Sequence, residues 1–319
     1  MKCFVLRVVL PAILLGFIGC TAEQSPQDGD AAMSPGSVEN AAAETAEAQA
    51  IAALEKLGAT VKVDGDGHPV AVELVGDAAT DAATVHLNGF KKLRNLRLSG
   101  EAITDAAMEN LAGLESLAVL KLDMTSVGDA GLEKLKPLAN LQELYLAGTK
   151  VTDAGLAYLA EWSKLARLRV SQTGITGDGF RHWQQLTSLA DLDASNTQVG
   201  DAALSHLEQL PGLVKLNLYT TGVTDGGLEH LGRMTQLSWL NLDNTKVTDA
   251  GLAKLAPLEN LDFLHLGRTG ITDAAVERLA GFKNLKTLHV TRTAVSSEAA
   301  EKLRQALPDC DILSGVPPE

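Results

Sequence analysis

The sequence predicts an α/β solenoid with a curved parallel β-sheet on its concave side and short helices on its convex side. The octet TKVTDAGL at residues 149–156 recurs unchanged at 245–252, and the pattern LxxLxLxxTx(V/I)TDAGLxxLxxLxx recurs every 24 residues. The first part of each copy has the period of 2 of a strand, and the second part has apolar residues at i, i+3 and i+6, as in a helix. Such copies stack side by side and share one core.

The repeats occupy residues 69–308. A weaker copy begins at Pro69, and nine regular copies start at Leu93, Leu117, Leu141, Leu165, Leu189, Leu213, Leu237, Leu261 and Leu285. The motif resembles the leucine-rich repeat family. Thr replaces the Asn that is usual after LxxLxLxx and is followed by TDAGL, which resembles a bacterial subgroup found in exported proteins. The resemblance implies a leucine-rich repeat solenoid of ten units.

Two polar columns run through the repeats. We expect the Thr hydroxyl to form a hydrogen bond with a backbone group inside its own turn, at positions 125, 149, 173, 197, 221, 245, 269 and 293. We expect the Asp to cap the N–H groups of its own helix rather than to bind calcium, at positions 81, 105, 129, 153, 201, 225, 249 and 273. The fifth unit moves its Asp to 178, which predicts a distorted helix start there.

Both ends of the stack need caps, because an open end exposes core. Residues 44–68 are predicted to form an N-terminal cap, with a helix over 44–57 and two alternating runs around a DGDG turn. A final helix over 297–307 and a closing strand in CDIL follow, with 309–319 as C-terminal cap and tail. We expect Cys310 to be a buried structural thiol. No second domain is expected.

The N-terminus has the features of an export signal. Lys2 and Arg7 precede an apolar run over 8–18 that is too short to span a bilayer as a helix. The FIGC sequence that follows resembles a bacterial lipoprotein box, which implies a signal peptide over 1–19 and a lipid on Cys20. Ordinary secretion is the alternative. Residues 20–43 contain few large apolar residues, which predicts a flexible tether. We therefore expect lipid anchoring to the bacterial cell envelope, at the outer membrane or in the periplasm.

Composition narrows the choice of partner. The formal charge is −13, and removing Lys2 and Arg7 with the leader would make it −15, which argues against coating nucleic acid or an anionic membrane.

Cys310 would be left alone after loss of Cys3 and lipidation of Cys20, so no intrachain disulfide is available. We expect no cofactor and a monomer.

The third, fifth and seventh positions of each unit face outward from the sheet and are the candidate partner-binding positions. Basic residues on the N-terminal half are expected to form a stripe that Asp191 and Asp193 interrupt. Aromatic residues gather on the C-terminal half, and exposed aromatic and Arg side chains often dominate binding energy. The candidate partner-binding residues are Arg97, Lys121, Tyr145, Arg167, Arg169, Tyr219, Trp239, Phe263, His265 and His289.

The histidines do not predict a metal site. His86, His182, His206 and His230 share one helix position, where neighbours lie farther apart than on strands and no acidic or Cys partner recurs nearby. His265 and His289 are expected to lie one strand spacing apart, about 4.8 Å. Two imidazoles are still fewer than the three or four ligands of a zinc site.

The function that the sequence favours is noncatalytic binding of a protein or glycan partner through the concave sheet. No nucleophile elbow, zinc-helix motif or phosphate-binding Gly loop supports the alternative of an envelope hydrolase, and a structural scaffold is a further alternative. A ubiquitin-ligase adaptor role of the F-box type is suggested only by repeat similarity. It is disfavoured, because residues 1–68 are already assigned to signal, tether and cap.

Overall fold

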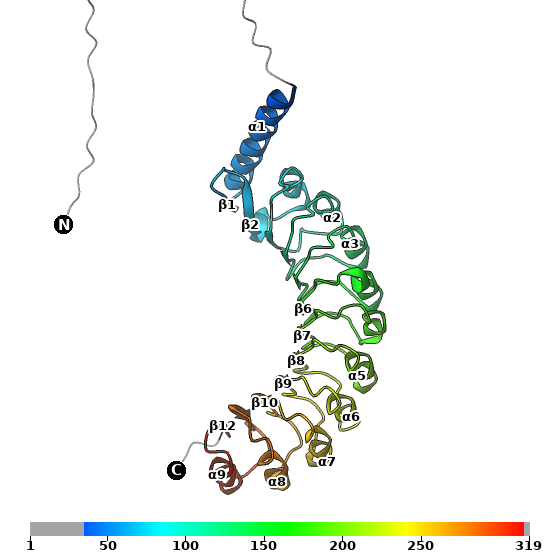
Figure 1. Ribbon diagram of the computed structural model, residues 1–319, viewed down its shortest axis with the longest axis vertical. Coiled ribbons are helices and arrows are strands. Elements are labelled where there is room, and N and C mark those ends of the chain that lie inside the picture. The colour runs from blue at the N-terminus through cyan, green and yellow to red at the C-terminus, as the bar shows by residue number, and fades with distance from the viewer. Residues whose placement is uncertain (1–34, 316–319) are drawn as a thin grey trace, which may run out of the picture. The chain divides into compact units, whose positions relative to one another are not determined.

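The computed structural model describes residues 35–315, with side chains from residue 46 onward. The described residues from 42 onward belong to one compact unit, and helix α1 (Pro35–Lys56) begins before residue 42. Several predicted features lie outside the described residues. They are the signal peptide, the expected lipid on Cys20, the first part of the tether and the last four residues of the tail. Within the compact unit, one 12-stranded sheet lines the inner side of a curved stack and helices lie on the outer side, as Figure 1 shows.

The strands lie in the sheet in their chain order, each beside the next. β1 pairs with β2 antiparallel and every later pair is parallel. The strands are β1 (Thr60–Val63), β2 (Pro69–Val75), β3 (Asn95–Ser99), β4 (Val119–Lys121), β5 (Glu143–Tyr145), β6 (Arg167–Arg169), β7 (Asp191–Asp193), β8 (Lys215–Asn217), β9 (Trp239–Asn241), β10 (Phe263–His265), β11 (Thr287–His289) and β12 (Asp311–Leu313). From β2 to β12, each residue pairs with the residue 24 positions later, as in Leu96 with Leu120. The predicted fold class and stacking are confirmed.

Short helices connect successive strands. The α-helices after α1 are α2 (Met108–Leu111), α3 (Asp129–Lys134), α4 (Asp153–Leu156), α5 (Asp201–Leu207), α6 (Leu228–Leu231), α7 (Asp249–Leu252), α8 (Val276–Leu279) and α9 (Ser297–Ala306). The 3₁₀ helices are η1 (Gly76–Ala78), η2 (Asp81–Leu87), η3 (Ala157–Glu161), η4 (Asp178–His182), η5 (Ala253–Leu255) and η6 (Asp273–Ala275). Such short helices depend on packing rather than on propensity for stability.

The core lies between the sheet and these helices. The central residue of each three-residue strand from β4 to β11 is a fully buried Leu, as at Leu144 and Leu264, while the flanking residues are exposed or half-buried. This is the period-2 alternation expected of a half-buried strand. The core is continuous from Leu54 in α1 to Ile312 in β12, so each repeat buries its apolar face against the next.

The Thr column forms the predicted hydrogen bonds. Each hydroxyl donates to the backbone carbonyl three residues earlier, as from Thr149 to Leu146 at 2.7 Å and from Thr245 to Leu242 at 2.6 Å. The same bond recurs in all eight units that carry this Thr. Buried polar groups need such partners, and the small Thr side chain satisfies itself within its own turn.

The Asp column does not cap its own helix, and that part of the prediction is wrong. The Asp129 carboxylate accepts from the backbone N–H of Thr152 in the next repeat at 2.8 Å and from the Thr152 hydroxyl at 2.6 Å. The Thr152 oxygen in turn accepts from Ala154 N–H and is the actual helix cap. Asp201, Asp225 and Asp249 bind the next repeat in the same way. Asp and Thr therefore form a bridge between repeats.

This bridge also explains the Gly of TDAGL. A Cβ at Gly155 would collide with the Asp129 carboxylate of the preceding repeat, and a Cβ at Gly251 would collide with that of Asp225. The Gly thus leaves room for the bridging carboxylate. In the fifth unit, Gly177 stands where the Asp is expected and has a left-handed φ of 96° at the start of η4. The predicted distortion is confirmed, and no Asp bridge links this unit to the sixth.

The caps differ from the prediction in two details. α1 begins at Pro35 rather than at 44, so part of the segment expected as a tether is helical. The Ala and Glu residues there lack apolar bulk but favour helix. Cys310 is half-buried rather than buried, because it lies in the turn between α9 and β12. β12 pairs with β11 and closes the sheet as expected, and Asp64 closes the DGDG turn by accepting from His68 N–H at 3.0 Å.

We expect Leu146→Asp to unfold several neighbouring repeats. Leu146 is fully buried, and an unpaired carboxylate there would cost more than about 3 kcal/mol. Arg169→Ala removes an ion pair between the exposed Arg169 and the half-buried Asp193 and should change stability by less than about 1 kcal/mol. Thermal unfolding followed by circular dichroism measures both variants, and a larger loss in Arg169→Ala than in Leu146→Asp would contradict the assignment of faces.

We expect Asp225→Ala to destabilise the stack by about 1–3 kcal/mol, because it removes two hydrogen bonds to a charged group that link Asp225 to Thr248. Asp178→Ala is the matched control, since Asp178 is exposed and bridges no described repeat; its effect should stay within about 0.5 kcal/mol. Urea unfolding measures the difference. Equal effects of the two substitutions would exclude the inter-repeat bridge as a source of stability.

Candidate functional site

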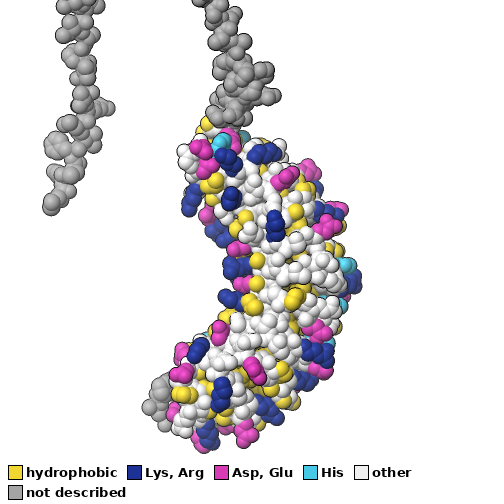
Figure 2. Space-filling view, viewed as in Figure 1, with side chains coloured by type: hydrophobic (Ala, Val, Ile, Leu, Met, Phe, Trp, Pro, Cys, Tyr) yellow, Lys and Arg dark blue, Asp and Glu magenta, His cyan; other side chains and the backbone are white. Residues whose placement is uncertain are grey.

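The candidate residues lie on the concave face of the sheet. Outward side chains of β3 to β11 are exposed or half-buried, and those on neighbouring strands stand side by side because the register is constant. Lys and Arg lie next to Asp and Glu along the concave edge in Figure 2. The face therefore consists of columns in which each side chain stands beside the one 24 residues away.

The predicted basic stripe is an alternation of charges. Arg167 lies between Glu143 at 3.4 Å and Asp191 at 3.1 Å. Arg169 pairs with Asp193 at 3.1 Å. The expectation of a positive stripe is therefore wrong for these cations. The sequence does contain this alternation, since constant register places residues 24 positions apart side by side on neighbouring strands.

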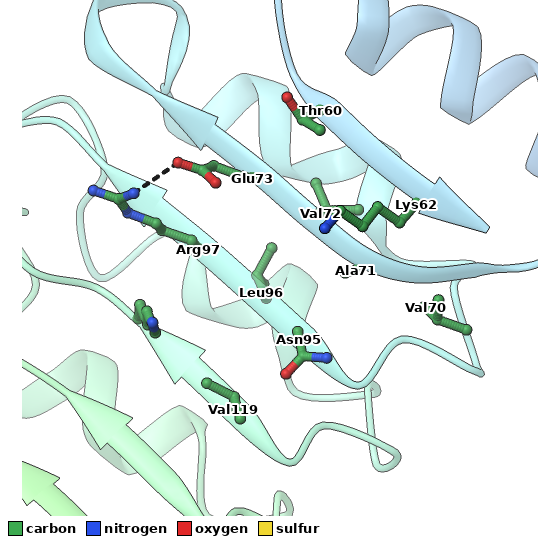
Figure 3. A pocket seen from close by; sticks show the side chains of 11 residues that line it. Thr60, Lys62, Val70, Ala71, Val72, Glu73, Asn95, Leu96, Arg97 and Val119 are labelled. Atoms are coloured by element: carbon green, nitrogen blue, oxygen red, sulfur yellow. Dashed lines mark hydrogen bonds and ion pairs between the residues drawn. The ribbon is translucent and has the colours of Figure 1, made fainter. Parts of the chain in front are cut away.

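The N-terminal end of the face contains a shallow hollow. Strands β1 to β4 line this space of about 470 Å³, and its floor includes Val72 and Leu96. Figure 3 shows Arg97 at one side, paired with Glu73 at 2.7 Å. Farther along the same column, Lys121 lies 4.9 Å from the centre of the Tyr145 ring, a cation–π distance. Tyr145 is therefore separate from the other candidate aromatic residues.

The C-terminal half carries an aromatic cluster formed by Trp239, Phe263, His265 and His289. The rings of Trp239 and Phe263 are stacked, with centres 4.6 Å apart and planes 6° apart. The rings of His265 and His289 are stacked at 4.2 Å, close to the predicted strand spacing. The Phe263 ring contacts His289 at 5.4 Å. Three neighbouring strands thus join these four predicted residues in one cluster.

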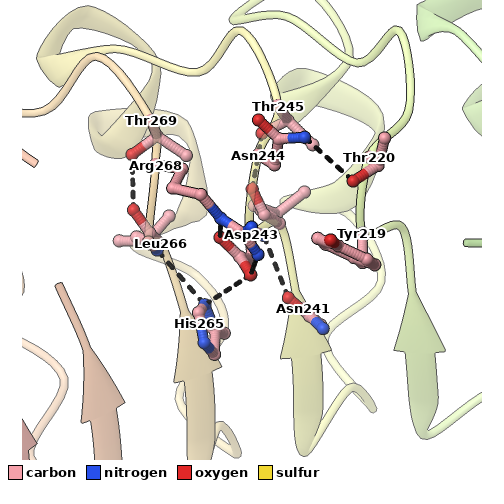
Figure 4. A network of polar contacts seen from close by, with 12 residues as sticks. Tyr219, Thr220, Asn241, Asp243, Asn244, Thr245, His265, Leu266, Arg268 and Thr269 are labelled. Atoms are coloured by element: carbon pink, nitrogen blue, oxygen red, sulfur yellow. Dashed lines mark hydrogen bonds and ion pairs between the residues drawn. The ribbon is translucent and has the colours of Figure 1, made fainter. Parts of the chain in front are cut away.

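Tyr219 belongs to an adjacent polar network rather than to this cluster. Figure 4 shows Arg268 between Asp243 and Tyr219. The Asp243 side chain is only 9% exposed and accepts from Arg268 Nε at 2.9 Å and from Arg268 Nη2. The same guanidinium lies 5.0 Å from the Tyr219 ring centre. Sequence reasoning missed Arg268, whose left-handed φ of 52° directs its side chain back over the preceding repeats.

His265 connects the network to the aromatic cluster. Its Nδ1 accepts from Gly267 N–H at 3.2 Å, so the proton of the neutral ring is on Nε2. Burial lowers the pKa of His265 to about 4, and the neighbouring His289 and Arg268 act in the same direction, against the attraction of Asp243. Burial also lowers the pKa of His289. Both rings are therefore neutral at pH 7.

The helix-side histidines show no metal centre. His230 Nδ1 lies 2.9 Å from a Glu208 oxygen. Among the described side chains, no three His, Cys, Asp or Glu residues are grouped so that they could hold a metal ion.

No helix within residues 35–315 combines the length and the apolar character needed to cross a membrane.

Comparison with known proteins identifies the fold. A family model described as Leucine Rich repeat matches residues 138–160. The chain has a leucine-rich repeat fold. The solved structure of an internalin, InlF, from Listeria monocytogenes resembles it with a TM-score of 0.58 and 21% identity, over 72% of this chain and 69% of the internalin. Internalin C2 from the same organism gives 0.50 and 26%, over 66% and 84%. No curated protein sequence matches the chain.

We expect the stability of the leucine-rich repeat stack to fall as the pH drops from about 6.5 to about 4. The folded pKa of His265 is below its ordinary value, so protons bind preferentially to the unfolded chain in this window, at a cost of up to about 3 kcal/mol. Urea unfolding at several pH values measures this change in the free energy of unfolding. His265→Asn is the control, because the Asn241 side chain accepts from the backbone N–H two residues later, as His265 does. The variant therefore keeps this hydrogen bond and removes the titrating ring. An unchanged pH dependence in this variant would contradict the assignment.

Proposed function

We propose that this protein is a noncatalytic recognition protein that binds a protein partner through the concave face. The observation that carries the proposal is the cluster of Trp239, Phe263, His265 and His289, which lies half-exposed on the face that the helices do not cover. Large aromatic side chains held rigidly on a sheet contribute binding energy at low entropic cost. The cluster and the Asp243–Arg268 network together supply an apolar centre with a polar border, which is the usual anatomy of an interface.

The rigidity of the face supports recognition rather than catalysis. Its aromatic rings hold one another in place through stacking, and its Arg side chains are held by carboxylates on neighbouring strands. Such pre-organisation lowers the entropy that binding must overcome. A catalytic site needs groups whose protonation or nucleophilicity suits a reaction, and the neutral, stacked histidines of this face are instead suited to contact.

The proposal includes anchoring to the cell envelope. The apolar run over 8–18 and the FIGC sequence at residues 17–20 support export and lipidation of Cys20. A chain fixed by its N-terminus would hold the solenoid near the membrane and present it to proteins of the same compartment. This localisation rests on the sequence.

Crosslinking followed by mass spectrometry in the native cell envelope tests the proposal. We expect the double variant Trp239→Ala/Phe263→Ala to lose the crosslinked protein that the wild type captures, because truncating anchor residues at a binding face typically costs 2 kcal/mol or more. Arg233→Ala is the matched control, since Arg233 is exposed on the helix side. Identical crosslinks in wild type and double variant would place the binding surface elsewhere.

A further inference from the structure

Five side chains on β8 to β10 form a patch that presents only hydrogen-bond donors. Lys215 and Trp239 stand in the third column of the face, and Asn217, Asn241 and His265 stand in the fifth. The parallel register places them on three adjacent strands, about 4.8 Å apart. We call these five residues the donor patch.

The backbone fixes which atoms of the fifth column face outward. The Asn217 side-chain oxygen accepts from Tyr219 N–H at 3.2 Å, and the Asn241 oxygen accepts from Asp243 N–H at 2.9 Å. His265 Nδ1 is engaged in the same way with the N–H two residues later. The acceptor of each side chain is thus directed to its own turn. The amide NH₂ groups of both Asn residues and the Nε2–H of His265 remain for a ligand.

The third column adds two further donors. Trp239 Nε1–H has no partner among the described residues, and no polar atom of the described side chains is both buried and unpaired, so this N–H faces solvent. Lys215 is exposed and forms no ion pair within the described residues.

The carboxylates around the donor patch are already engaged. Asp191 stands beside Lys215 but accepts from Arg167 at 3.1 Å. Asp193 accepts from Arg169 and from Ser195 N–H, and Asp243 is held by Arg268. Asp191, Asp193 and Asp243 therefore each have their own cation, and the exposed Asp262 lies before Phe263, outside the five donors.

We propose that the donor patch binds an acidic segment of the protein partner, through carboxylate and carbonyl oxygens that accept from its N–H groups. This inference rests on the proposed function and names the partner chemistry. An ionised carboxylate accepts hydrogen bonds and donates none, and bonds to charged acceptors are stronger than neutral ones. A sugar ring would stack on an aromatic face. Trp239 and His289 already lie against the Phe263 ring, and binding of a sugar to Trp239 is the competing outcome of the test.

The test uses the full chain and three synthetic probes: a peptide of alternating Glu and Gly, its Gln-for-Glu counterpart, and an oligogalacturonate. Isothermal titration gives the affinities. Fluorescence gives a second readout, since Trp162 and Trp183 are buried and Trp239 is not. We expect the Glu peptide to bind at least about tenfold more tightly than the other two probes.

The variant Asn217→Asp/Asn241→Asp replaces outward donors with carboxylates while keeping the inward acceptors, as Asp193 does naturally on β7. It should fold and lose at least about tenfold in affinity for the Glu peptide. Asn95→Asp, an exposed change on β3, is the matched control and should bind as the wild type does.

Three results would overturn the inference: equal affinity for the Glu and Gln peptides, undiminished affinity in the double Asp variant, or tighter binding of the oligogalacturonate. The crosslinking experiment separates this inference from the proposed function. If the double Asp variant keeps the crosslinked protein that Trp239→Ala/Phe263→Ala loses, the concave face binds a partner and the acidic-segment inference is wrong.

Discussion

The parallel ladder in which every residue pairs with the residue 24 positions later determines the rest of this structure. Most strands contain only three residues, too few to be stable alone, so each depends on the strands at both sides. The helices are equally short. The Asp–Thr bridges link the start of one helix to the start of the next, with Asp and Thr always 23 residues apart. The ladder and the bridges hold opposite sides of each repeat in one register, which leaves little freedom for one unit to shift against the next.

The same register organises the chemistry of the concave face. Side chains that would be scattered on an irregular surface form columns with neighbours about 4.8 Å apart. This spacing brings flat rings into stacking distance, as in Trp239 with Phe263 and His265 with His289. It also forces charges in one column to alternate or repel, and the chain alternates them through Glu143, Arg167 and Asp191. The face is therefore rigid because its side chains support one another.

The repeat pattern was enough to predict the strands, the core and the Thr hydrogen bonds, because each depends on spacing within one unit. The partner of the Asp column could not be predicted in this way. A carboxylate at a helix start can accept from its own helix or from the next one, and the choice depends on how closely the helices stack. The recurring Gly of TDAGL was a signal in the sequence that space is needed at this position. Only the packed structure shows that the carboxylate of the preceding repeat fills the space beside Gly155. Arg268 was missed because its direction depends on a left-handed φ, which the same position adopts in most repeats, as at Gln172 and Thr220. The alternation of side chains along a strand does not predict this conformation.

The net charge of the chain bears on the acidic partner inferred for the donor patch. A formal charge of −13 repels an acidic ligand at long range, whereas the five donors act only at contact. Salt screens exposed charges beyond a Debye length of about 8 Å at physiological ionic strength, so it weakens the repulsion more than it weakens the hydrogen bonds. Association should therefore be slow at low salt and faster at physiological salt, the reverse of an electrostatically steered encounter. Specificity for such a partner would then come from the alignment of the donors on three strands, which the 24-residue register fixes.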